Sequence, residues 1–341
     1  MSRFRNFTLF AALIALALAF AACGGGGSDD PQSVVDEATL QGIESGNIDL
    51  SLGIDVQGSK GGHLDVGVSG PFQGESEAEY PELDMTASAK GSIGGEKVDF
   101  EGGLTLLGNK AYVAYEDTEY EVDPTTFNFV RTIVKRRGGG KKQSTELTAC
   151  QEAAAELQLS DFVENLEGEG SADVGGTSTN KVSGDLDVSG AVEAAAELSE
   201  DPACSEQLNA AGSLSAARLE KAKAQVEESL KGAHVVLYVG DDHIVRRITA
   251  QATVEPPKAS TSSGGGAKSA EIDLDLTLTG VNEEQAISAP QSSKPLSNLF
   301  IKLGINPIEL LGLLQGSGPG GLSGPGGLSG LLEGFAAGGT Q

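Results

Sequence analysis

Apolar and polar residues alternate along much of this chain with the two-residue period of a β-strand. In the stretch 47–57 every even position is apolar: Ile48, Leu50, Leu52, Ile54 and Val56. After the Gly-rich turn at 58–62, Leu64, Val66 and Val68 continue the alternation. This pattern predicts a hairpin of two half-buried strands. Pro71 is expected to end the second strand.

The same reasoning predicts further strands at 83–89, 98–106, 111–115, 119–122, 181–189, 235–239, 244–254 and 272–278. Helical patterns occupy 146–157, 191–198 and 213–232. The last of these has Ser213 as its N-cap and Gly232 at its end. Strands and helices therefore come in separate blocks. That order predicts an α+β fold in which a large antiparallel sheet packs on helices.

The N-terminus has the pattern of a bacterial lipoprotein signal. Arg3 and Arg5 precede an uncharged run over 7–22, and small residues lead to Cys23. An uncleaved membrane-spanning helix is the alternative. It needs roughly 20 apolar residues, and it does not explain a cysteine followed directly by four glycines. We therefore predict cleavage before Cys23.

In such proteins the new N-terminal cysteine carries a diacylglycerol on its thiol and a further acyl chain, such as palmitate, on its amine. Two chains suffice for stable attachment, so Cys23 is predicted to anchor the protein to the outer face of the bacterial cytoplasmic membrane. The expected organisation is a signal peptide (1–22), a lipidated Gly-rich tether (23–32), one domain (33–289) and a Leu/Gly-rich tail (290–341). Within the tail, the leucines of 310–314 could form a short amphipathic helix.

The chain is strongly acidic. Its formal charge is −26, and removal of 1–22 with Arg3 and Arg5 makes it −28. Such a chain lacks the basic surface that nucleic acid requires, and its body is repelled by anionic lipid. One basic stretch, 131–142, is expected to be a solvated loop, with contact to anionic head groups as the alternative.

Besides Cys23 the chain has two cysteines, Cys150 and Cys204. In an exported protein such a pair predicts a disulfide, although two unrelated thiols remain possible. A zinc site is not expected, because none of the three histidines has metal-ligand spacing from a cysteine.

No motif in the sequence indicates catalysis. There is no Gly-x-Ser-x-Gly elbow and no calcium-binding Asp-x-Asp-x-Asp-Gly loop. His243 follows Asp241 and Asp242, but a Gly-Asp-Asp turn between two strands explains all three residues. We therefore expect a protein that is not an enzyme and has no cofactor or metal.

Several short motifs together resemble the LppX/LprG-type lipoprotein carriers. Besides the lipoprotein signal, they lie at 45–52, 110–115, 120–122, 173–176, 182–185 and 219–248. The resemblance implies a LolA/LolB-like half-barrel, in which helices pack on the concave face of a curved antiparallel sheet and enclose a hydrophobic cavity. It also implies binding of acylated lipid or lipoglycan and its transport across the cell envelope, with a transporter or another envelope component as a possible partner.

The residues expected to line such a cavity are the apolar positions of the predicted strands, namely Ile48, Leu50, Leu52, Ile54, Leu64, Val66, Val68, Phe100, Leu104, Leu106, Val235, Leu237, Ile272, Leu274, Leu276 and Leu278. The same residues would suit a solid core equally well. A surface lipoprotein that binds an envelope protein or glycan, and carries no lipid, is therefore the alternative function.

Overall fold

The computed structural model describes residues 30–58, 61–74, 81–93, 95–137, 159–200, 204, 223–224, 228–255 and 267–304. They fall into two compact units. Unit 1 lies within Met1–Ile43, Leu50–His63 and Thr145–Thr279, and unit 2 within Glu44–Asp49, Leu64–Ser144 and Gly280–Gln341. Cys23, Cys150 and the helices expected at 146–157 and 310–314 lie outside the described residues.

Unit 1 combines six strands with short helices. Its described helical elements include α2 (Pro31–Asp36), η1 (Leu159–Phe162) and α5 (Val188–Glu200). Its described strands are β1 (Ser45–Gly58, from Leu50 on), β7 (Val163–Val174), β8 (Thr177–Leu186), β9 (Leu230–Gly240), β10 (Val245–Val254) and β11 (Ala267–Thr279). The apolar side chains Val34 and Val35 of α2 and Val188 and Val192 of α5 are buried.

Unit 2 contains a run of consecutive antiparallel strands. Its described elements are β2 (Gly62–Gln73, from Leu64 on), β3 (Glu82–Ile93), β4 (Glu96–Leu107), β5 (Lys110–Tyr115), β6 (Thr118–Glu121), α3 (Pro124–Arg137), β12 (Lys294–Pro295) and α8 (Leu296–Leu303). Helix α3 begins after Asp123, whose carboxylate accepts the N–H groups of Thr125 and Thr126, both at 3.0 Å. The hydrogen bonds from Thr126 lower the pKa of Asp123.

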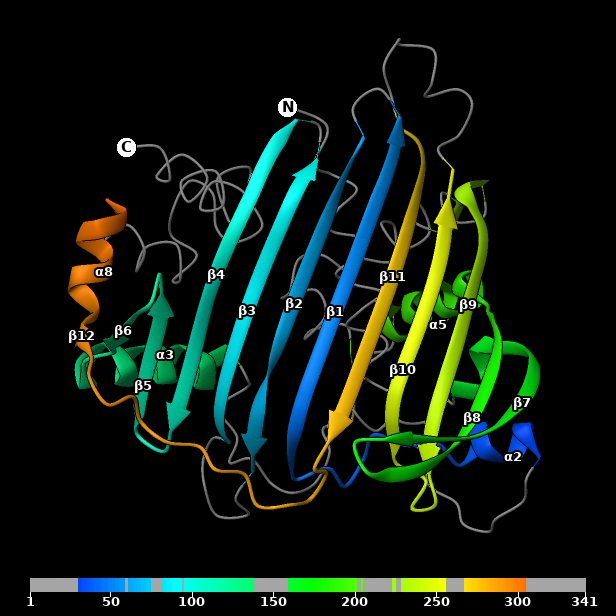
Figure 1. Ribbon diagram of the computed structural model, residues 1–341, viewed down its shortest axis with the longest axis horizontal. Coiled ribbons are helices and arrows are strands. Elements are labelled where there is room, and N and C mark those ends of the chain that lie inside the picture. Colours follow the sequence, from blue (N-terminus) through cyan, green and yellow to red (C-terminus); the bar gives the residue numbers. More distant parts are fainter. Residues whose placement is uncertain are drawn as a thin grey trace. The chain divides into compact units, whose positions relative to one another are not determined.

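Among the described residues, twelve strands follow the order β12-β6-β5-β4-β3-β2-β1-β11-β10-β9-β8-β7 in one sheet. The pairs β3–β4, β4–β5 and β5–β6 are antiparallel, as are β7–β8, β8–β9, β9–β10 and β10–β11, whereas β12 is parallel to β6 (Figure 1). The predicted α+β fold with a large antiparallel sheet is confirmed.

Tight turns connect consecutive strands, including β7, which the sequence analysis did not predict as a strand. Between β9 and β10, the N–H of Gly240 donates to the carbonyl of Ile244 at 3.0 Å, and His243 takes a positive φ of 61°. Between β7 and β8, Gly175 has a φ of 59°, and a Cβ there would come within 2.5 Å of Thr279 Cγ2. A side chain would therefore disfavour this turn by both conformation and contact.

Some boundaries differ from those expected. The helix predicted to reach Gly232 stops earlier, because Leu230 pairs with Val254 and Gly232 with Thr253 in β9. Strand β2 continues past Pro71, since proline costs a strand one donor while its φ suits extended backbone. The basic stretch expected as a loop from 131 begins as the last turns of α3. Within the segment assigned to the tail, 294–303 form β12 and α8.

Candidate functional site

Unit 2 presents an apolar surface formed by β3, β4, β5 and β6, which we call the unit 2 apolar face. Paired residues of an antiparallel sheet lie on the same side of it. The register places side by side Met85, Leu104, Val113 and Tyr120. The same side carries Leu83, Ala87, Ala89, Val98, Phe100, Leu106, Ala111 and Tyr115. The predicted lining residues Phe100, Leu104 and Leu106 thus share one face.

Most of the unit 2 apolar face is only partly buried. Leu104, near its middle, is 43% exposed, and it is one of the two large apolar side chains exposed among the described residues. Its neighbours Met85, Leu106 and Val113 are half-buried. The apolar side of a sheet is normally covered by other elements. This face therefore has apolar area available for a further apolar group.

Helix α8 packs at one end of this face. Leu296 and Leu299 are buried against Tyr120, and partly buried Val113 and Tyr115 surround them. Lys302 of α8 forms an ion pair with Glu116, and its Nζ lies 5.4 Å from the centroid of the Tyr115 ring. The mutual hydrogen bond lowers the pKa of Glu116 and raises that of Lys302. Burial, followed by the charge of Glu116, raises the pKa of Tyr115.

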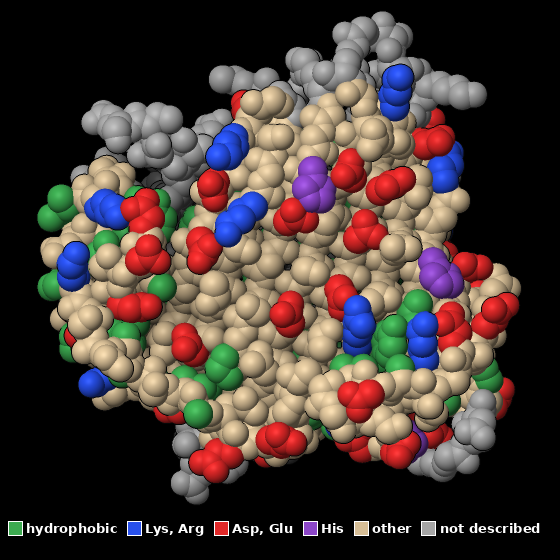
Figure 2. Space-filling model, viewed as in Figure 1, with side chains coloured by type: hydrophobic (Ala, Val, Ile, Leu, Met, Phe, Trp, Pro, Cys, Tyr) green, Lys and Arg blue, Asp and Glu red, His purple; other side chains and the backbone are tan. Residues whose placement is uncertain are grey.

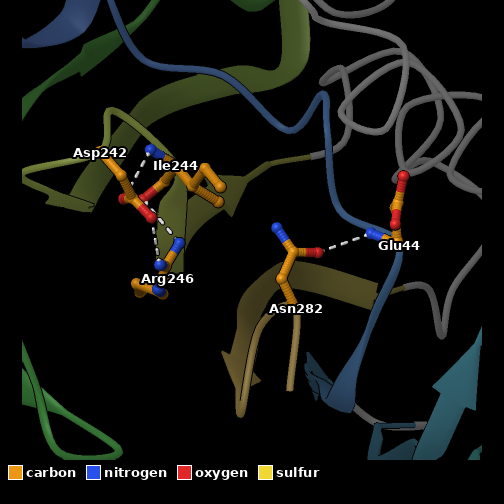
Figure 3. Close-up of polar contacts among 5 residues, drawn as sticks. All are labelled: Glu44, Asp242, Ile244, Arg246 and Asn282. Carbon is orange, nitrogen blue, oxygen red and sulfur yellow. Dashed lines mark hydrogen bonds and ion pairs between the residues drawn. The ribbon is translucent and has the colours of Figure 1, made fainter. Parts of the chain in front are cut away.

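The opposite side of the same strands is mainly polar, and it also carries the buried Tyr112, which pairs with Thr105. Thr105, which is buried, donates its hydroxyl to Asp84 at 2.8 Å, and Lys90 pairs with Glu101 at 3.0 Å. Glu119 has one buried carboxylate oxygen with no hydrogen-bond partner among the described residues. Burial raises the pKa of Glu119, with a smaller effect from the charge of Asp84. A separate polar contact, from the N–H of Glu44 to Asn282 Oδ1 at 2.8 Å, joins the start of β1 to the segment after β11 (Figure 3).

Unit 1 has a corresponding surface on β8, β9, β10 and β11, which we call the unit 1 apolar face. One row across it consists of Val182, Leu237, Ile248 and Leu276, and all four are buried. The next row contains Gly184, Val235, Ala250 and Leu274. Strand β11 also contributes Ile272 and Leu278, both buried. The predicted lining residues of β9 and β11 therefore share a face, and most of it is filled by the protein itself.

The reverse side of this sheet is mainly polar. Lys181, Tyr238 and Arg247 form a row, with both cations within 6 Å of the tyrosine ring centroid. Each cation also has a carboxylate partner: Lys181 pairs with Glu169, and Arg247 Nε donates to Asp275 at 3.0 Å. These hydrogen bonds raise the pKa values of Lys181 and Arg247 and lower that of Glu169. Figure 2 shows a face of the molecule on which red carboxylate side chains are widely spread.

A second arginine of β10, Arg246, is buried at the end of the β9–β10 hairpin. Its side chain is 8% exposed, and its Nη2 donates to Asp242 Oδ2 at 2.6 Å (Figure 3). Asp242 also accepts the N–H of Ile244 at 3.2 Å. The predicted strand at 244–254 contained this residue, but nothing in the alternation alone indicated a buried charge. The only signal was a charged Arg-Arg pair inside an apolar strand.

The same hairpin holds the N-terminal segment of the described chain. His243 Nδ1 lies 3.0 Å from Glu37 Oε2, and the backbone of Thr39 bonds to His243 and Val245, both at 2.9 Å. His243 thus has a glutamate partner rather than either aspartate of its own turn. This arrangement is a structural contact between segments distant in the sequence.

The remaining predicted lining residues lie on β1 and β2. On β1 the alternation agrees with burial, because Ile48, Leu50 and Leu52 are half-buried and Ile54 is buried, while Asp49 and Ser51 between them are exposed. On β2, Leu64 is buried, and Val66 and Val68 are half-buried. That these residues line a ligand cavity stays a prediction.

Cys204 is fully buried and disulfide-bonded. Its expected partner, Cys150, lies outside the described residues, so this pairing stays a prediction. Across the described ranges, no group of three or more histidine, cysteine or acidic side chains is arranged to hold a metal ion. In that same part of the chain, no helix combines the length and apolar character of a membrane span.

No protein-family model and no curated protein matches the chain. Among solved structures, it is similar to LprF from Mycobacterium bovis, with 12% identity, coverage of 79% of this chain and 100% of that chain, and a TM-score of 0.32. For the lipoprotein LppX from Mycobacterium tuberculosis, the identity is 12%, the match covers 76% of this chain and 98% of that chain, and the TM-score is 0.29. A LolA superfamily protein from Nitrosomonas europaea has 8% identity, and the match covers 76% of this chain and 97% of that chain with a TM-score of 0.17.

Proposed function

We propose that this protein is a membrane-anchored lipoprotein that binds acylated lipid or lipoglycan against its apolar sheet surface and helps to carry it across the cell envelope. The anchor is the acylated Cys23, on the outer face of the bacterial cytoplasmic membrane. A transporter or another envelope component supplies or receives the lipid.

The unit 2 apolar face is the observation that carries this proposal. Its apolar side chains share one side of four strands, yet Leu104 remains 43% exposed and Met85 and Leu106 are half-buried. Covering such area with an acyl chain is favourable by about 0.8 kcal/mol for each methylene removed from water. A carrier needs this shielding, because a lipid with long acyl chains does not cross water unaided.

The sequence supports the same assignment independently. The lipoprotein signal places the protein at a membrane, and the motifs of the LppX/LprG type span both units. The acidic body, at −28 after processing, keeps the protein itself off anionic lipid. The tether, rather than the surface charge, then holds the carrier at the membrane.

The test measures lipid bound by the purified full-length protein. Mass spectrometry of a solvent extract is expected to detect acylated lipid in addition to the anchor. Uptake of a fluorescent acyl probe is expected to weaken about tenfold in Leu104→Gln, because the substitution puts an amide in the apolar face. Thr86→Gln is the matched control, since Thr86 is exposed on the opposite side of the same sheet.

Two results together would contradict the proposal. One is protein free of extractable lipid, and the other is a melting temperature unchanged by added lipid, because a ligand bound to the native state must stabilise it. The alternative function, a surface lipoprotein that binds an envelope protein or glycan, would then be favoured.

A further inference from the structure

Both large apolar side chains that are exposed among the described residues belong to unit 2. Leu104 of β4 is 43% exposed near the middle of the unit 2 apolar face, and Ile301 of α8 is 78% exposed. The described helices of this unit have their main contacts elsewhere, α3 with β5, and α8 with β6 and β12. The apolar side chains of β3 and β4 are therefore only partly covered by the described part of the chain.

The sequence that follows α8 is almost uncharged. Residues 305–341, which we call the C-terminal tail, contain eight leucines but only two charged residues, Glu309 and Glu333, whereas 21% of the whole chain is charged. Leucine is among the residues most often buried in folded proteins. A nearly neutral segment is also not repelled by the acidic body. This composition favours contact between the C-terminal tail and an apolar surface of the same chain.

The C-terminal tail begins beside the unit 2 apolar face. Gly304, with a φ of 64°, caps the end of α8, and that helix is packed against Tyr120 of β6. The row from Tyr120 through Val113 to Leu104 crosses two strand spacings, or roughly 10 Å. Nine residues, as in 305–313, span roughly 17 Å as a random coil. The first leucines of the tail can therefore reach Leu104.

These first leucines are at positions 310, 311, 313 and 314. In a helix Leu310, Leu313 and Leu314 would share one side, because residues three and four positions apart are neighbours. Two copies of Gly-Pro-Gly-Gly-Leu-Ser follow at 318–329, and their glycine and proline content is poorly suited to a helix. The stretch 310–314 is thus the part of the tail best suited to present several leucines to one surface.

We infer that the leucines of 310–314 dock on the unit 2 apolar face and cover Leu104 when no lipid is bound. The docking follows from composition and reach, whereas its competition with lipid rests on the proposed function. Burial of leucine favours the docked tail, and ordering of the backbone opposes it. The two arrangements are therefore in equilibrium. A tail docked for about nine-tenths of the time weakens the apparent affinity for lipid about tenfold.

Photo-cross-linking in the full-length protein tests the docking directly. A benzophenone amino acid replaces Leu104, and after irradiation the protein is cleaved at its glutamates, which releases 310–333 as one fragment. We expect mass spectrometry to find this fragment joined to the fragment that contains position 104, in protein that remains a single chain. The same amino acid in place of Thr86, exposed on the opposite side of the sheet, is the control and should not capture the tail.

Binding of a fluorescent acyl probe tests the competition. The double variant Leu313→Ser with Leu314→Ser should bind the probe about tenfold more tightly than the natural protein, because its tail no longer occupies the face. Truncation after Gly304 should have the same effect. Leu322→Ser with Leu328→Ser is the matched control and should leave probe binding unchanged. Thermal melting establishes that each variant is folded, and if the truncated chain is not, the full-length variants decide.

The remaining outcomes separate this inference from the proposed function. Docking is overturned if position 104 captures no tail fragment, if it captures a second copy as a covalent dimer, or if position 86 captures the tail equally well. Unchanged probe affinity in Leu313→Ser with Leu314→Ser overturns the competition and leaves lipid binding intact. If no form of the protein binds the probe, the proposed function fails, and capture of 310–333 from position 104 then supports the docking alone.

Discussion

Leu237 in unit 1 and Leu104 in unit 2 occupy similar places in their own sheets. Each lies in an apolar row across antiparallel strands, between Val182 and Ile248 in one case and between Met85 and Val113 in the other. Yet Leu237 is 1% exposed and Leu104 is 43% exposed. The same alternating pattern therefore produces a filled core in one unit and a partly open apolar surface in the other.

The difference teaches that strand periodicity sets the direction of a side chain but not its environment. In unit 1 the apolar residues of α2 and α5 are buried together with those of the strands, and α2 contacts β7, β8 and β9. In unit 2, α8 packs around Tyr120 at one end of the apolar face. Stability is thus expected to depend mainly on the first face and ligand binding on the second.

The largest expected effect comes from truncating each leucine in turn. Leu237→Ala should lower the free energy of unfolding by about 3 kcal/mol, because it leaves a cavity in a packed core. Leu104→Ala should change it by less than about 1 kcal/mol, since the lost methyl groups are already partly in water. Urea unfolding of both variants checks this. Equal losses would show that the two faces are packed alike and would remove the distinction between the units.

The strand faces could be predicted from sequence because period two and antiparallel register are both local consequences of backbone geometry. Ile48 to Leu52 alternate in burial as their pattern indicates, and the leucines of β11 share a face with those of β9 as expected. Leu230 shows the limit of that reasoning. Its apolar side chain fits the helical pattern and the strand pattern equally well. In the structure Leu230 pairs with Val254 and therefore belongs to the strand.

The features that distinguish the candidate sites depend on contacts between residues distant in sequence. The exposure of Leu104 follows from which elements cover it, and no local pattern contains that information. The burial of Arg246 follows from a bulge relative to β9, which inserts one residue into the register. Helix α8 lies in a segment whose composition indicated a Leu/Gly-rich tail, and its burial depends on Tyr120 of β6.

A smaller effect is expected from the carboxylates on the polar sides of the two sheets. In unit 1, Glu169 and Asp275 each pair with a cation, whereas in unit 2 one oxygen of Glu119 is buried and has no hydrogen-bond partner within the described part of the chain. Burial raises the pKa of Glu119 above its ordinary value. The folded state therefore holds this proton more tightly than the unfolded state. Its contribution to stability falls as pH rises from the ordinary pKa through the folded one.

Glu119→Gln should accordingly stabilise the protein at neutral pH, by about 1 kcal/mol, the scale of an unsatisfied buried polar group. The gain should vanish in acid, where Glu119 is protonated in both states. Thermal melting between pH 3 and 8 measures the difference. Glu121→Gln is the control, because Glu121 is exposed on the same strand. A variant less stable than the natural protein at neutral pH would indicate that the carboxylate has a favourable partner.

The smallest expected effect concerns Lys302 of α8 and Glu116, the ion pair beside Tyr115. The pKa of Glu116 is lower in the folded state than its ordinary value. Its contribution to the free energy of unfolding is therefore present above the ordinary pKa and is lost as pH falls through the pKa of the folded state. The pKa of Lys302 is higher in the folded state than its ordinary value. Its contribution to the free energy of unfolding is therefore present below the ordinary pKa and is lost as pH rises through the pKa of the folded state. The pair is thus expected to stabilise α8 across the whole neutral range.

Because both side chains are exposed, salt should screen this contribution almost completely. Lys302→Met should lower the melting temperature slightly at low ionic strength and leave it unchanged at 1 M salt, whereas Lys110→Met, at the exposed start of β5, should have no effect at either. A decrease in melting temperature that persists at 1 M salt would mean that the aliphatic part of Lys302 stabilises α8 by packing against Tyr115. The packing around Tyr120, rather than charge, would then decide how firmly α8 closes the end of the unit 2 apolar face.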